Sequence, residues 1–137
     1  MIIFNYFFKL YIAIFIHANQ AFEKMFKLTL TLQAWNTSAF NTVFKKEIRS
    51  LTANYLPLQQ GLSVSNYAIT DNLSATVLKV EDNDKTLFVK AGLFYTGIIA
   101  GCNCADDPTP VDENNEYCEV LFSINKTTAE TTVSLIS

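Results

Sequence analysis

The chain has 137 residues, a formal net charge of -3 and a hydrophobic content of 50%. This length fits a single domain with its own core, and the composition is that of a globular protein, not a disordered one. A surface that binds nucleic acid needs clustered Lys and Arg. The nearest such group is Lys45, Lys46 and Arg49, which we interpret as a solvated helix face. We therefore expect no nucleic-acid partner.

Residues 1–24 form a hydrophobic leader without Gly, Pro, Ser or Thr, and Met25 follows directly. One interpretation is a signal peptide, although no positive charge precedes Lys9. A second is a membrane anchor, but residues 1–16 span about 24 Å as a helix, short of the roughly 30 Å hydrocarbon layer, and Lys9 would lie near the middle. The third, which we favour, is that translation starts at Met25. We accordingly expect a single domain over residues 25–137.

The first predicted elements of this domain are a strand and a helix. Residues 26–34 alternate strictly between apolar and polar side chains, which is typical of a half-buried strand. From Ala39 the apolar side chains recur every three or four residues, which predicts an amphipathic helix to about Thr52. Its apolar positions are Phe40, Val43, Phe44, Ile48 and Leu51.

The remaining pattern predicts strands joined by polar turns. Residues 63–69 form a weak strand, and residues 75–80 and 86–100 form a hairpin whose second strand is apolar on both faces and therefore central. Gly92 and Gly97 predict a bulge or bend within that strand. Cys118, Val120, Phe122 and Ile124 then alternate along another strand, and residues 131–136 close a second hairpin.

These elements predict an α+β fold. One amphipathic helix would pack on a twisted antiparallel sheet of about five to six strands, in the order β-α-β-β-β-β-β. The order is similar to that of cystatin-like and related small α+β folds. The similarity concerns architecture alone, so it assigns no functional residues.

The sequence lacks the residues that several common catalytic and nucleotide-binding sites require. His17 is the only histidine, and it lies in the leader, so residues 25–137 cannot supply a Ser-His-Asp or Cys-His centre. The glycine-containing stretch from Gly92 to Gly101 matches neither the P-loop nor the dinucleotide-binding pattern. The sequence therefore favours a binding module over an enzyme, and we name no catalytic residues.

All three cysteines lie between residues 102 and 118, among many carboxylates. One hypothesis is a zinc site with Cys102, Cys104, Cys118 and Asp106 as ligands, because zinc accepts thiolates and carboxylates in a tetrahedron. A second is thiol redox chemistry, although the acidic surroundings should raise the thiol pKa values. The third interpretation makes Cys118 a small buried hydrophobic residue facing the core, and the acidic residues a solvated loop.

The sequence thus favours a small non-enzymatic binding or accessory protein whose interaction surface is the segment from Cys102 to Glu119, with zinc as its candidate cofactor and another protein as its candidate partner. The alternatives are a thiol-redox protein using Cys102 and Cys104, or a module tethered to a membrane or in the periplasm through residues 1–24. The odd number of cysteines favours a reducing compartment, the cytoplasm. Secretion or membrane anchoring would require a genuine leader.

Overall fold

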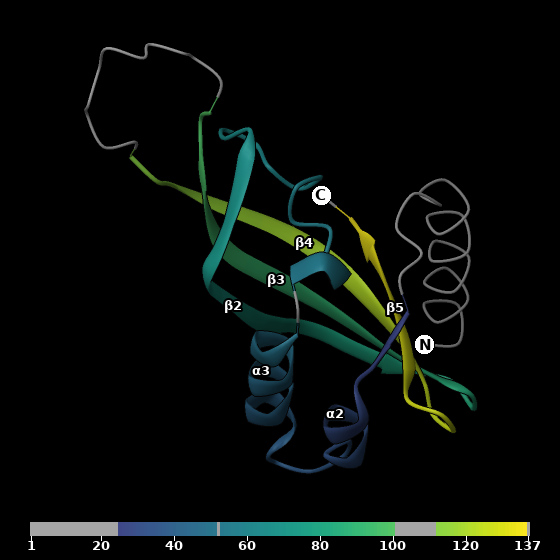
Figure 1. Cartoon of the computed structure of the whole chain (residues 1–137). Helices are drawn as coiled ribbons and strands as arrows, with labels where there is room; N and C mark the ends of the chain where they lie inside the picture. Colours follow the sequence, from purple (N-terminus) through teal and green to yellow (C-terminus); the bar gives the residue numbers. More distant parts are fainter. Residues whose placement is uncertain (1–24, 52, 101–111, 137) are drawn as a thin grey trace, which may run out of the picture.

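The computed structural model describes residues 25–51, 53–100 and 112–136. They form a curled, five-stranded antiparallel sheet with two α-helices (Figure 1). The strands are β1 (Phe26–Lys27), β2 (Tyr67–Asp82), β3 (Thr86–Ile98), β4 (Asn114–Asn125) and β5 (Glu130–Leu135), in the spatial order β1-β5-β4-β3-β2. The helices are α2 (Thr29–Gln33) and α3 (Phe40–Ser50), and a short 3-10 helix, η1 (Ala53–Tyr55), follows. The predicted combination of an antiparallel sheet with helical packing is confirmed.

The core lies between α3 and the inner face of the sheet. Phe40, Phe44 and Ile48 are buried on α3, as the predicted stripe requires. The ring of Phe44 packs edge-on against Phe122 of β4, with centroids 5.4 Å apart. Because a helix with one apolar stripe needs one apolar surface to cover, this contact fixes which face of the sheet is the inner one.

The predicted strand over residues 26–34 is wrong after its first two residues, where the chain turns into α2. The carboxylate of Glu47 on α3 accepts hydrogen bonds from the backbone N–H groups of Leu30 and Thr31, at 3.0 and 2.8 Å. Since the first N–H groups of a helix have no partners within it, this carboxylate from a second helix stabilises α2. The alternation of apolar and polar residues over 26–34 cannot indicate this contact, because Glu47 lies outside that segment.

The predicted strand at residues 75–80 and the last three residues of the predicted strand at 63–69 lie in one 16-residue strand, β2, whereas residues 63–66 precede it and are not a strand. Its pairing with β3 shifts register between Ile69 and Ser74 and again between Val77 and Lys79. Extra residues in one strand bend it, and β2 is sharply bent where it crosses in front of β3 (Figure 1). The bulges expected at Gly92 and Gly97 of β3 lie in β2 instead. The extra residues at both register shifts belong to β2, and β3 pairs with β4 without a shift.

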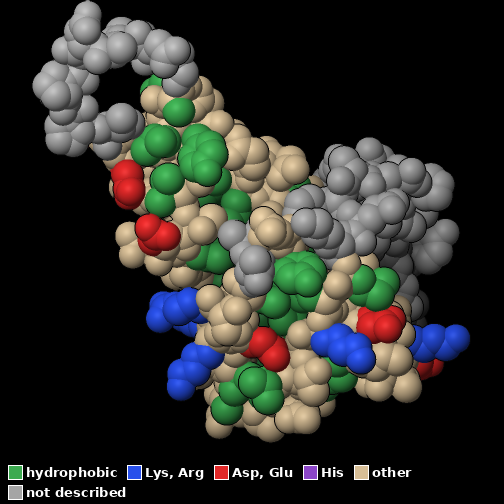
Figure 2. All heavy atoms as spheres, viewed as in Figure 1, with side chains coloured by type: hydrophobic (Ala, Val, Ile, Leu, Met, Phe, Trp, Pro, Cys, Tyr) green, Lys and Arg blue, Asp and Glu red, His purple; other side chains and the backbone are tan. Residues whose placement is uncertain are grey.

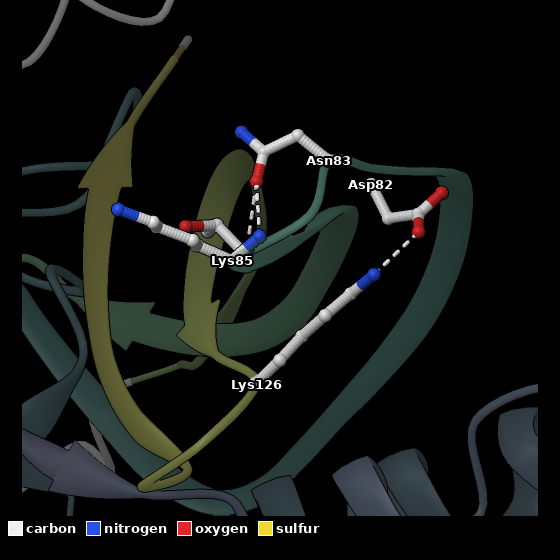
Figure 3. Close-up of polar contacts among 5 residues, drawn as sticks. Asp82, Asn83, Lys85 and Lys126 are labelled. Carbon is white, nitrogen blue, oxygen red and sulfur yellow. Dashed lines mark hydrogen bonds and ion pairs between the residues drawn. The ribbon is translucent and has the colours of Figure 1, made fainter.

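Polar contacts tie the two hairpin turns together at one end of the sheet. The side-chain oxygen of Asn83 accepts hydrogen bonds from the backbone N–H groups of Lys85 and Thr86, at 2.9 and 2.8 Å, and fixes the β2–β3 turn (Figure 3). The Lys126 ammonium, from the β4–β5 turn, pairs with the Asp82 carboxylate. The opposite end of the sheet, where β3 and β4 meet residues 58–65, carries the residues considered next.

Candidate functional site

The continuous pairing of β3 with β4 determines which side chains lie together. Leu93 pairs with Cys118, Phe94 with Tyr117, and Tyr95 with Glu116. Because successive side chains of a strand point to opposite faces, Cys118, Glu116 and Tyr95 share the inner face, whereas Phe94 and Tyr117 share the outer one. One segment of the predicted interaction region therefore presents two chemically different surfaces.

Cys118 is a free, fully buried thiol. Burial raises its pKa to about 11, although the hydroxyl of Tyr95 acts in the opposite direction. This confirms the interpretation of Cys118 as an inward-facing core residue. Cys102, Cys104 and Asp106 lie outside the described residues, so their assembly into a zinc site with Cys118 stays a prediction. Within the described ranges, no group of three or more His, Cys, Asp or Glu side chains is placed to hold a metal.

Glu116 is a buried carboxylate, with 3% of its surface exposed, and its hydrogen bonds all go to residues of the domain itself. It accepts four hydrogen bonds from residues 63–65: from the backbone and hydroxyl of Ser63 at 2.8 and 3.0 Å, and from the backbone of Val64 and Ser65 at 3.2 and 2.8 Å. Burial raises the pKa of Glu116, but these hydrogen bonds outweigh it and hold the pKa at about 2. The carboxylate clamps this loop to β4.

Tyr95 and Gly61 complete the buried cluster. The Tyr95 hydroxyl donates a hydrogen bond to the carbonyl oxygen of Leu58 at 2.7 Å. A Cβ atom built on Gly61 would lie 2.9 Å from the sulfur of Cys118 and 3.0 Å from the Tyr95 hydroxyl. Burial raises the pKa of Tyr95, so the phenol stays protonated and keeps its donor. The loop therefore covers the thiol closely, which is a structural arrangement and not that of an accessible nucleophile.

The outer face carries an exposed aromatic pair, Phe94 and Tyr117. Their ring centroids are 4.8 Å apart, and 48% and 41% of their surfaces are exposed. Tyr67, another exposed aromatic residue, lies on β2 and pairs with Ile98 at the end of β3. On the other side of the sheet, where η1 lies, hydrophobic side chains gather at the upper left of the space-filling view (Figure 2). Exposed apolar clusters of this kind are typical of interaction surfaces.

Neighbouring residues hold the Tyr117 ring in one position. Its hydroxyl donates to the Glu119 carboxylate at 3.1 Å, and the ammonium of Lys90 lies 3.5 Å from the same carboxylate group. A Cβ atom on Gly92 would lie 2.7 Å from the ring, so the missing side chain makes the space in which the ring lies. Partial burial and the Glu119 acceptor raise the pKa of Tyr117. The ring is thus ordered before any partner arrives.

A separate cleft of about 590 Å³ lies between α2 and α3, away from this cluster. Leu30, Ala34 and Val43 contribute to its mostly apolar wall. Glu47 also borders it, but that carboxylate already accepts the two backbone N–H groups of α2. Gln33 and Lys46 also line the cleft, and no further observation indicates a ligand for it.

Sequence reasoning missed the roles of Glu116 and Phe94. Glu116 was expected in a solvated acidic loop, yet it lies two residues before Cys118, in the same inward register. Extending the Cys118–Ile124 alternation backwards would have placed it inside. Adjacent residues of a strand face opposite sides, so Phe94 lies on the outer face while Tyr95 lies in the core. Because apolar side chains occupy both faces of this strand, their pattern does not indicate which face is exposed.

Comparison with known proteins gives no relative: no family model, no curated protein and no solved structure matches the chain. In the part of the chain that the structure describes, no helix is long and apolar enough to cross a membrane. Function must accordingly be argued from the surfaces themselves.

Proposed function

We propose that residues 25–137 form a small non-enzymatic binding domain and that the partner is another protein. The observation that carries this proposal is the ordered, exposed pair of Phe94 and Tyr117 on the outer face of the sheet. Aromatic side chains that are rigid before binding lose little entropy on association and are enriched among the residues that dominate binding energy. The helices pack on the opposite face and leave this one accessible.

The inner cluster supports a binding role over a catalytic one. Glu116, the described carboxylate with the most strongly lowered pKa, has its hydrogen bonds directed to a loop within the fold. Cys118 is buried with a raised pKa, which disfavours a thiolate nucleophile at this position. The zinc hypothesis would require Cys102, Cys104 and Asp106 to reach the Cys118 thiol where it lies in the core.

The cytoplasm remains the proposed location. Secretion or membrane attachment remains the alternative and depends on whether residues 1–24 are a genuine leader in the native protein.

Site-specific photo-crosslinking tests the binding proposal. A benzoylphenylalanine replaces Tyr117 in the full chain expressed in its native host, and a matched protein carries it at Lys45, which is exposed on α3. We expect one or a few defined protein adducts at position 117 that are missing at position 45 and weaken when Phe94→Ser is added. Identical adduct patterns at the two positions, or no adduct at position 117, would contradict the proposal.

A further inference from the structure

We draw no further inference here: the strongest candidate, the mostly apolar cleft of about 590 Å³ between α2 and α3 that Lys46 also lines, carries no proposal because nothing in the structure shows what would occupy it.

Discussion

The carboxylate of Glu116 accepts the backbone N–H of Ser65 at 2.8 Å, across 51 residues of sequence. Three further hydrogen bonds from Ser63 and Val64 reach the same carboxylate. Three consecutive backbone N–H groups therefore converge on one buried charge, which fixes the loop before β2 against the inner face of β4. The same strand presents Tyr117 on its other face, so the clamp also fixes the backbone of the proposed binding surface.

Replacing Glu116 with Gln should destabilise the fold. The amide keeps the volume, but one of its two polar atoms can no longer accept a hydrogen bond, and buried N–H donors lose their partners. We expect a loss of about 2–4 kcal/mol in the free energy of unfolding, measured by urea denaturation. Glu119→Gln is the matched control: this carboxylate is partly exposed, with its ion pair to Lys90 at 3.5 Å, and its loss should cost under about 1 kcal/mol. If the two variants lose the same free energy of unfolding, the hydrogen bonds of Glu116 to residues 63–65 do not stabilise the fold as proposed.

The same carboxylate should make the free energy of unfolding depend on pH in the acidic range. The pKa of Glu116 is lowered from 4.5 to about 2 in the folded chain. A lowered folded-state pKa stabilises the fold above the unfolded-state value, and this contribution falls as pH drops from about 4.5 to about 2. The loss should reach roughly 3 kcal/mol. Subtracting the pH profile of Glu116→Gln from that of wild type isolates the contribution, and a flat difference over this range would contradict the assignment.

Cys118 should be unreactive in the folded protein. With Cys102 and Cys104 replaced by Ser, it is the only thiol in the chain. It is fully buried and its pKa is raised to about 11, so a disulfide reagent at pH 8 should modify it only when the loop at Gly61 opens. The labelling rate, compared with that in urea, measures this opening. Fast labelling under native conditions would show that the loop at Gly61 does not cover Cys118.

The parts of the fold that follow from local periodicity could be predicted from the sequence. Phe40, Phe44 and Ile48 mark α3 through their spacing, and the doubly apolar run of β3 correctly indicates a strand between two others. The inward position of Cys118 follows from the alternation of β4. In each case the residues that determine the structure are neighbours along the chain, so their pattern carries the information.

The parts that depend on distant residues could not be predicted in this way. Residues 29–33 alternate as a strand would, but the carboxylate of Glu47 stabilises them as a helix. Glu116 looks solvated until residues 63–65 are placed against it. The sequence singles out the region ending at Glu119 for its cysteines and charges. In its described part Asp112 and Glu113 are indeed exposed, but the exposed aromatic ring of Tyr117 does not follow from that reasoning.

Two glycine substitutions should separate the inner cluster from the outer surface. At Gly61, an added Cβ would lie 2.7 Å from the Cβ atom of Cys118, which cannot move without the backbone, so Gly61→Ala should cost about 1–3 kcal/mol of unfolding free energy. At Gly92, the added Cβ would meet the far end of the Tyr117 ring, also at 2.7 Å, and that ring can swing towards solvent. Gly92→Ala should therefore cost less stability but displace the ring, reducing the yield of adducts at a photo-crosslinker placed at Phe94. If Gly92→Ala loses more stability than Gly61→Ala while leaving that yield unchanged, Tyr117 is a structural residue of the sheet and not an anchor for a partner.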